Sequence, residues 1–433
     1  MGFLKKALLL FVAFRAGDLV NLAAGMWFVP KYVKPEDIGA VLPLSSFATF
    51  LALPIFAFAM TVMKESSVLA ANGARGKIKS LLRGVFVVVG IATLLVLAAT
   101  ALIMPRFAGA MGIKGGALFF LVVAAAFLGC VAPVWTDALQ SLKRFGTLAF
   151  AESAGSVFRF VVMLAVMPFK ALQGYFAGQA ALPVFRILVS VIALRRDLRV
   201  LAEPFWNRQN ARRMALFFVG VLVYQAIPMG VSLIEYSALR LALPAENSAG
   251  YFMITRFSDF LYYLTFPLLL VAFPYTATAA ERGESTQPYV KKCSAITLAA
   301  ALLMMVVYAL SGSRLLALLP NGADYLMYAK YMPYMVIITA LTSCQVFYTN
   351  AEVSAGRFGF LLWFVPLHLL YVIGLSFAVK TGIVNSLDGF IVCFAVIALL
   401  RFLFGLFQLS QANLARPRKF QLGLERFGKF SKV

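Results

Sequence analysis

The sequence is poor in charged residues, although it is long enough for several domains. Only 13% of its 433 residues are charged, against about 25% in soluble domains, and 62% are hydrophobic. This composition excludes a soluble globular protein, because too few polar side chains remain to cover a surface in water. It predicts instead a protein that crosses a membrane many times.

Cysteine and histidine are also scarce. The cysteines Cys130, Cys293, Cys344 and Cys393 lie in or beside apolar segments, and no two of them form a C-x-x-C pair. This spacing indicates neither a disulfide framework nor a metal site, and we expect no cofactor. The single histidine, His368, lies in an apolar run. We interpret it as a packed, hydrogen-bonded side chain, and the alternative is a proton carrier.

Acidic residues are few, at 17 against 39 basic residues, for a net charge of +22. A nucleic-acid-binding surface would gather this positive charge on one face. The Lys and Arg residues instead lie mainly in alternate loops between the apolar segments, so we expect no nucleic-acid partner. The predicted outer loops are short and hold no catalytic dyad or metal cluster. We therefore expect a protein that is not an enzyme.

Twelve apolar stretches are long enough to cross a bilayer as helices, which takes about 20 residues each. A helix is the only open-chain structure that satisfies its own backbone in lipid. The sequence therefore predicts an all-α polytopic membrane protein with about 12 transmembrane helices. The expected spans are 7–30, 38–63, 80–104, 117–139, 148–168, 173–194, 214–235, 250–273, 292–313, 327–349, 359–379 and 388–410.

The orientation follows from the basic residues. With the N-terminus in the cytoplasm, 25 of the 39 Lys and Arg residues lie on the cytoplasmic side, nine outside and five within spans. Cytoplasmic loops carry such an excess, so we expect a multi-pass protein of the cytoplasmic (inner) membrane with both termini inside. The start could also be a cleaved signal peptide, but Arg15 and Asp18 interrupt its apolar core.

The chain repeats itself at an interval of about 210 residues. Phe257-Ser-Asp-Phe-Leu261 matches Phe47-Ala-Thr-Phe-Leu51, and Arg357-Phe-Gly359 matches Arg144-Phe-Gly146. Several matches at nearly one interval indicate a duplication. Two six-helix lobes related by a pseudo-twofold axis along the membrane normal would then meet around a site.

This duplication divides the chain into four parts. We expect an N-terminal lobe (1–194), a basic cytoplasmic connector (195–213), a C-terminal lobe (214–410) and a basic cytoplasmic tail (411–433). The tail mixes basic and aromatic residues, which is typical of a segment that lies on anionic lipid. A solvated, disordered tail is the alternative.

Polar side chains recur on one stripe of several spans, which indicates a shared wet interior. Helical spacing places residues three, four or seven apart on the same face. Ion pairs that only stabilise the packing are the alternative explanation. The stripes comprise Arg15 and Asp18 in the first span, Glu152, Ser156 and Arg159 in the fifth, Gln179 and Arg186 in the sixth, Gln225, Ser232 and Glu235 in the seventh, and Arg256, Asp259 and Tyr263 in the eighth.

Two segments of the sequence carry a family resemblance. They are Val29-Pro-Lys-Tyr-Val-Lys-Pro-Glu-Asp-Ile-Gly39, after the first span, and Ser248-Ala-Gly-Tyr-Phe-Met-Ile-Thr-Arg256, in the eighth. They resemble the first outer loop and the eighth span of the polysaccharide flippases of the multidrug/oligosaccharidyl-lipid/polysaccharide superfamily. The resemblance implies a V-shaped, two-lobed carrier that works by alternating access. The cationic cavity of that family would map onto Arg15 and Arg256, with Arg159 and Arg186 placed by position only.

The leading hypothesis is a flippase that moves a polyprenyl-pyrophosphate-linked oligosaccharide outward for synthesis of a surface polysaccharide. The substrate-binding candidates are Arg15, Arg159, Arg186 and Arg256, because planar guanidinium groups suit a pyrophosphate. Anionic membrane lipids and polysaccharide-synthesis enzymes are further candidate partners. One alternative is a cation-coupled multidrug exporter with Asp18, Glu152 or Asp259 as the ion-coupling residue. A non-transporting subunit of a polysaccharide secretion complex is the other.

Overall fold

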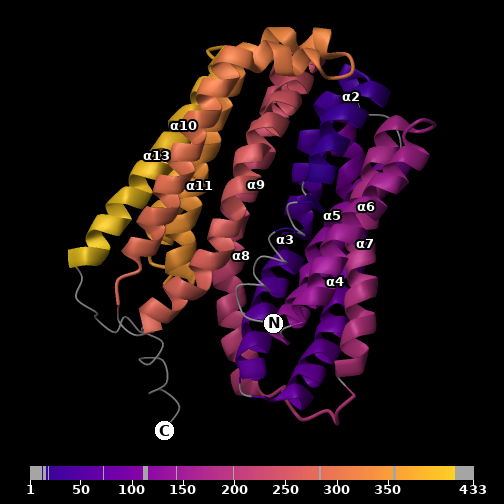
Figure 1. Ribbon diagram of the computed structural model, residues 1–433, viewed down its shortest axis with the longest axis vertical. Helices are drawn as coiled ribbons and strands as arrows, with labels where there is room; N and C mark the ends of the chain where they lie inside the picture. Colours follow the sequence, from indigo (N-terminus) through magenta and orange to yellow (C-terminus); the bar gives the residue numbers. More distant parts are fainter. Residues whose placement is uncertain are drawn as a thin grey trace. The chain divides into compact units, whose positions relative to one another are not determined.

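The protein is built from helices joined by short turns (Figure 1). The computed structural model describes residues 12, 16–17, 19–71, 73–110, 116–142, 144–197, 199–281, 284–354 and 357–414, and none of these residues is in a strand. The all-α fold predicted from the sequence is confirmed. In chain order the elements are the π-helix η1 (Ala24–Phe28), α2 (Val29–Tyr32), α3 (Pro35–Ala71), α4 (Arg75–Ala110), α5 (Gly116–Ser141), α6 (Phe145–Val166), α7 (Ala171–Asp197), α8 (Arg208–Ala242), α9 (Ala245–Glu281), α10 (Gln287–Ala317), the 3-10 helix η2 (Gly322–Tyr331), α11 (Met332–Ser354), α12 (Leu361–Lys380) and α13 (Leu387–Leu414).

Most helices lie where the apolar runs predicted them. The expected spans 38–63 and 173–194 fall inside α3 and α7. The largest difference is that residues 327–331 belong to the 3-10 helix η2, so α11 begins only at Met332. Pro333 explains this start: it has no N–H to donate, and the first turn of a helix is where that loss is tolerated. The expected spans 148–168 and 359–379 each extend two residues beyond their helices, α6 and α12.

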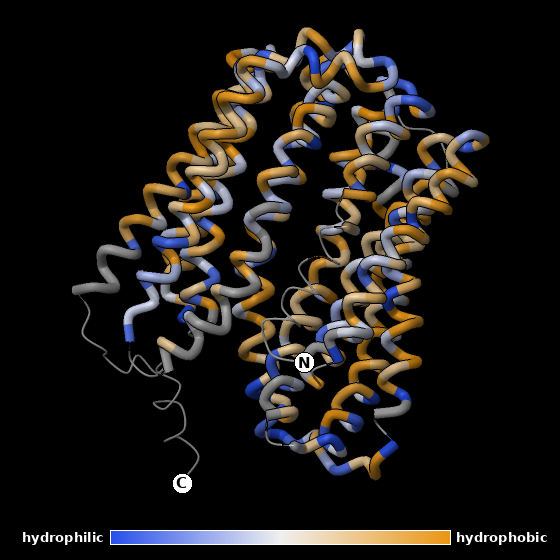
Figure 2. Tube along the Cα trace, in the orientation of Figure 1, coloured by the Kyte–Doolittle hydropathy of each residue, from blue (hydrophilic) through white to orange (hydrophobic). Residues whose placement is uncertain are grey.

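Nine of the described helices are long and apolar enough to cross a membrane. They are α3 to α8, α10, α12 and α13, and Figure 2 shows hydrophobic residues along them. The protein is thus a multi-pass membrane protein. Two further helices, α9 and α11, have 37 and 23 residues. Charged residues interrupt the apolar run of α9, among them Arg256 and Asp259. The first predicted span, 7–30, is described only in part.

The order of the helices supports the duplication. The helices α3 and α9 both have 37 residues, and their first residues, Pro35 and Ala245, lie 210 positions apart. The starts of α4 and α10 differ by 212 positions, and those of α5 and α11, α6 and α12, and α7 and α13 by 216 each. The long helices therefore follow one another in the same order in both halves of the chain.

The contacts divide the chain into two compact units. The first comprises Met1–Phe257, Ser311–Met332 and Val365–Phe390, and the second Ser258–Leu310, Pro333–Phe364 and Ile391–Val433. The first unit holds a hydrophobic core at one end of α3, α4 and α5, around Val62, Leu81 and Leu139. The core of the second unit joins α10 and α11 around Val290 and Phe347.

Within the first unit, α3 contacts α5 and α8, while α7 contacts α5 and α6. Glycines bring α6 and α7 close together. A Cβ on Gly174 would overlap Met167, and one on Gly178 would overlap Met163 and lie 3.2 Å from the carbonyl oxygen of Arg159. The Gly174-x-x-x-Gly178 segment therefore serves close helix packing, as small residues do in membranes.

Candidate functional site

The candidate site lies in the first unit, where the helical residues 16–17 and 19–23 and the adjoining η1, together called the first helix, meet α6. The amide of Asn21 donates to the Ser156 hydroxyl over 3.4 Å, and that hydroxyl donates to the Glu152 carbonyl oxygen over 3.0 Å. One turn earlier, Gly17 faces the same hydroxyl so closely that a Cβ would lie 2.7 Å from it. The polar stripe of α6 thus lies against the first helix at Gly17, a residue without a side chain.

An ion pair joins α6 to α7 beside this contact. The guanidinium of Arg186 pairs with the carboxylate of Glu152. Glu152 has 8% of its side chain exposed and Arg186 has 27%. A carboxylate that is this buried needs a cationic or hydrogen-bonding partner, because desolvation otherwise disfavours its charge. The sequence put these two residues in different classes, as an ion-coupling and a substrate-binding candidate, and the structure brings them together.

Asp137 on α5 is a residue that the sequence reasoning missed. Its carboxyl group lies close enough to Glu152 for the two negative charges to repel each other. It could have been noticed, because it falls within the predicted span 117–139. With Asp137 and the residues near the ends of the spans included, six arginines and six acidic residues lie within the predicted spans. The bulk charge balance of the spans therefore gives no preference for an anionic substrate.

Arg256 lies against the first helix at its π-helical turn. Its guanidinium carbon is 4.9 Å from the centroid of the Phe252 ring, one turn earlier on α9. Its Cδ atom lies 3.5 Å from the position that a Cβ would take on Gly25. Gly25 belongs to η1, and single π-helical turns occur frequently at functional sites. The absent side chain at Gly25 leaves the space that the arginine occupies.

The contacts of Asn21 and Gly25 connect Arg256 with α6. These two residues are four apart on the first helix, about 6 Å along its axis at 1.5 Å per residue. Arg159 is buried and follows Ser156 by three residues on the same stripe of α6. Phe28, also in η1, stacks edge-on against Phe160 with ring centroids 5.1 Å apart. The first helix therefore has α6 and Arg256 as neighbours within about one turn.

The remaining candidates have different outcomes. Arg15 and Asp18 lie outside the described residues. Asp259 is three residues from Arg256 on α9 but belongs to the second unit. Glu235 of α8 accepts a hydrogen bond of 2.7 Å from the hydroxyl of Tyr371 on α12. His368, on the same helix as Tyr371, is 2% exposed. The roles of all these residues stay predictions.

No family model matches the sequence, and no curated protein matches it either. Solved structures do match over nearly the whole chain. One is an inward-facing multidrug resistance MATE family transporter of the MOP superfamily, with a TM-score of 0.62 and 14% identity over 94% of this chain and 99% of that one. Another is a MOP superfamily transporter from Pyrococcus furiosus, with a TM-score of 0.62 and 16% identity over 94% and 96%.

A third structure is the lipid II flippase MurJ in an inward closed conformation. It has a TM-score of 0.65 and 10% identity over 94% of this chain and 87% of that one. Identities this low carry the fold and leave the substrate open. This chain therefore has the fold of the transporters of the multidrug/oligosaccharidyl-lipid/polysaccharide superfamily, the superfamily that its sequence resembles.

Proposed function

We propose that the protein is a flippase for a polyprenyl-pyrophosphate-linked oligosaccharide used in surface polysaccharide synthesis, and that it works by alternating access in the cytoplasmic membrane. The observation that carries the proposal is the position of Arg256, whose side chain lies beside Phe252 and in the space left open by Gly25. An arginine inside the membrane is costly, by about 2.5–3.5 kcal/mol on insertion scales, and such residues commonly mark a substrate pathway.

The chemistry of arginine supports an anionic substrate. Its planar guanidinium binds a phosphate through two parallel hydrogen bonds and keeps its charge at every physiological pH. Arg159 is also buried, on the stripe of α6 that carries Ser156. For the Pyrococcus furiosus transporter, a reverse polarity of the binding pocket suggests a different function. By the same reasoning, the local arginines here favour a pyrophosphate over a cationic drug. The solved flippase MurJ supports a lipid-linked substrate on this fold.

A fluorescent polyprenyl-pyrophosphate oligosaccharide in proteoliposomes tests the proposal. An impermeant quencher added outside reports the substrate that crosses. We expect Arg256→Ala to abolish transport and Arg256→Lys to restore only part of it, because lysine keeps the charge without the fork. The matched control is Arg106→Ala, which changes an exposed arginine near the C-terminal end of α4. Wild-type transport by Arg256→Ala at normal protein levels would overturn the proposal.

A second candidate function, a cation-coupled multidrug exporter, is favoured by the neighbouring carboxyl groups of Asp137 and Glu152 and by the solved MATE transporters. The same proteoliposomes distinguish the two functions. Uptake of a cationic dye driven by a proton or sodium gradient, without movement of the lipid-linked sugar, would establish the exporter. Transport by the purified chain alone would exclude a non-transporting subunit of a secretion complex.

A further inference from the structure

The connector between the two halves of the sequence, residues 195–213, is held in place by contacts with α4. Lys79 donates from Nζ to the Val200 carbonyl oxygen over 2.8 Å. The backbone N–H of Glu203 donates to the Gly76 carbonyl oxygen over 3.2 Å. Phe205 is buried in the hydrophobic core of the first unit. The connector therefore has a fixed position on this unit and is not a free tether.

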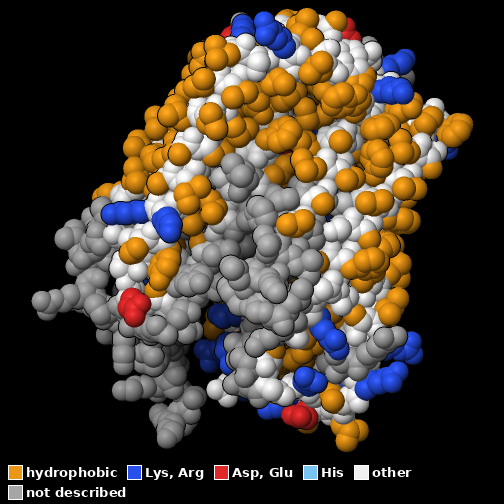
Figure 3. All heavy atoms as spheres, viewed as in Figure 1, with side chains coloured by type: hydrophobic (Ala, Val, Ile, Leu, Met, Phe, Trp, Pro, Cys, Tyr) orange, Lys and Arg blue, Asp and Glu red, His pale blue; other side chains and the backbone are white. Residues whose placement is uncertain are grey.

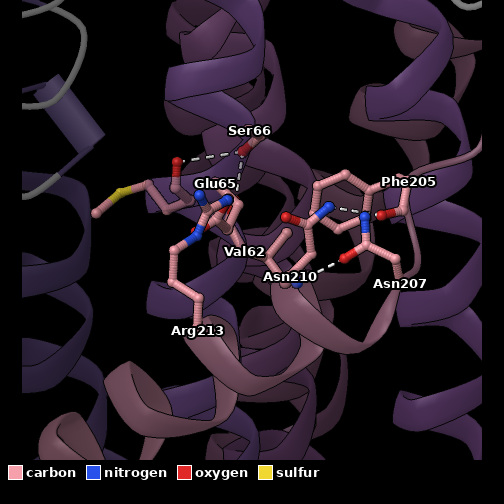
Figure 4. Close-up of polar contacts among 8 residues, drawn as sticks. Val62, Glu65, Ser66, Phe205, Asn207, Asn210 and Arg213 are labelled. Carbon is pink, nitrogen blue, oxygen red and sulfur yellow. Dashed lines mark hydrogen bonds and ion pairs between the residues drawn. The ribbon is translucent and has the colours of Figure 1, made fainter. Parts of the chain in front are cut away.

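Trp206 and the residues after it complete this attachment. The indole N–H of Trp206 donates to the Ser80 carbonyl oxygen over 3.2 Å. Its ring lies against Gly84 so closely that no Cβ would fit there. Asn207 then caps α8 by accepting 2.7 Å from the N–H of Asn210, whose side chain donates to the Phe205 carbonyl oxygen (Figure 4).

This fixed segment holds two large apolar side chains outward. Leu201 is 92% exposed and Trp206 is 42% exposed. Trp206 contacts α4 at Gly84, which comes two residues before the exposed Phe86. At 1.5 Å per residue, these two positions are about 3 Å apart along the helix axis. From Phe86 onward α4 presents a continuous exposed apolar face, which includes Leu94 and Leu95. Trp206 therefore lies at the edge of the lipid-facing surface of α4.

Exposed basic side chains surround these apolar ones. Figure 3 shows Lys and Arg gathered at the lower end of the helices in this view, below the hydrophobic side chains. The acidic Glu203 is turned against Gly76. A second copy of this chain would bring an equally basic surface and be repelled. Exposed basic residues here include Arg75, Lys77 and Arg83 of α4, and Arg195, Arg199, Arg208 and Arg212 of the connector and the start of α8. Arg213 is exposed as well but pairs with Glu65.

We infer that this surface binds the headgroups of anionic phospholipids, with Trp206 at headgroup level and the arginines on the lipid phosphates. Tryptophan prefers the membrane interface because its ring is apolar and its N–H is polar. Basic residues beside a membrane strengthen binding to anionic lipid by about fivefold each. The inference concerns the connector alone and holds whichever substrate the protein transports.

Tryptophan quenching tests this placement. A variant with Trp27, Trp135 and Trp363 changed to Phe keeps only Trp206. It is reconstituted in vesicles that contain phosphatidylglycerol or phosphatidylcholine brominated near the headgroup. We expect stronger quenching by the brominated phosphatidylglycerol at equal mole fraction. Equal quenching by both lipids would overturn the anionic preference, and no quenching by either would overturn the contact with the membrane.

Charge-removal variants test the arginines. Arg199→Gln with Arg208→Gln and Arg212→Gln should abolish the preference for phosphatidylglycerol, while Arg106→Gln, at the other end of α4, should keep it. A preference that survives the triple change would overturn the role of these residues. Native mass spectrometry of the chain with all four tryptophans gives a second readout, because bound phosphatidylglycerol should fall about fivefold for each arginine removed. An unchanged lipid count there would also overturn the inference.

Discussion

Arg186 of α7 forms an ion pair with Glu152 of α6, and Asp137 of α5 lies near the same carboxylate. Three helices of the first unit thus meet at one cluster of charges. The two carboxyl groups lie close enough to repel each other, and Glu152 also pairs with Arg186, so removing one of these charges changes the surroundings of the other two. A substitution at one of the three therefore acts on the whole cluster, and single variants have to be compared with double ones.

Glu152→Gln removes the carboxylate and leaves Arg186 without this partner. We expect the variant to lose about 3 kcal/mol of unfolding free energy, the lower end of the range for breaking a buried pair, because Arg186 is partly exposed. Glu152→Gln combined with Arg186→Gln should recover most of the loss. Denaturant unfolding in detergent measures both. If the double variant is as unstable as the single one and both lose ion-driven transport, Glu152 is an ion-coupling residue and not a packing partner.

Gly25 should tolerate a methyl group but not a large side chain. A Cβ there lies 3.5 Å from the Cδ atom of Arg256, an ordinary van der Waals distance. Gly25→Ala should therefore retain transport at near the wild-type rate, and Gly25→Leu should displace Arg256 and reduce transport as strongly as Arg256→Ala does. The proteoliposome assay compares the three variants. Full activity of Gly25→Leu would show that the position of Arg256 does not matter for transport.

Arg213 should matter more for stability than its neighbour Arg212. Arg213 binds both carboxylate oxygens of Glu65, at 3.1 and 2.5 Å, and ties α8 to α3 (Figure 4). Glu65 has 6% of its side chain exposed and Arg213 has 59%. Arg213→Ala leaves a buried carboxylate behind and should cost about 1–3 kcal/mol, whereas Arg212→Ala at an exposed position should cost about 0.5 kcal/mol or less. Equal unfolding midpoints for the two variants would contradict this expectation.

The distribution of basic residues predicts that position 208 lies inside the cell and position 34 outside. Arg208→Cys and Lys34→Cys are introduced separately after the four native cysteines are changed to serine. An impermeant maleimide applied to intact cells should label the cysteine at 34 and reach the one at 208 only after the membrane is opened. Labelling of position 208 in intact cells would reverse the predicted orientation and place the lipid surface of the connector in the outer leaflet.

The positions of the helices were largely predictable from the sequence. The expected span 173–194 lies inside Ala171–Asp197, and 388–410 inside Leu387–Leu414. The reason is that lipid leaves the backbone no partners outside its own helix, so an apolar run of sufficient length determines both the type and the extent of the element. The stripe Glu152, Ser156 and Arg159 was predictable for the same reason, because helical periodicity fixes which residues share a face.

The partner of each face was decided by the tertiary structure. Periodicity places Glu152 on a polar stripe, but the carboxylate could have met an arginine from any of several helices. The packing of α6 against α7, in which Gly155 lies next to Arg186, brings this arginine to it. Glu65 and Arg213 are 148 residues apart in the chain, and no local pattern connects them. The sequence by itself determined the helices and their polar faces. The folded chain determined which faces meet, because that choice depends on the side-chain shapes of helices distant in sequence.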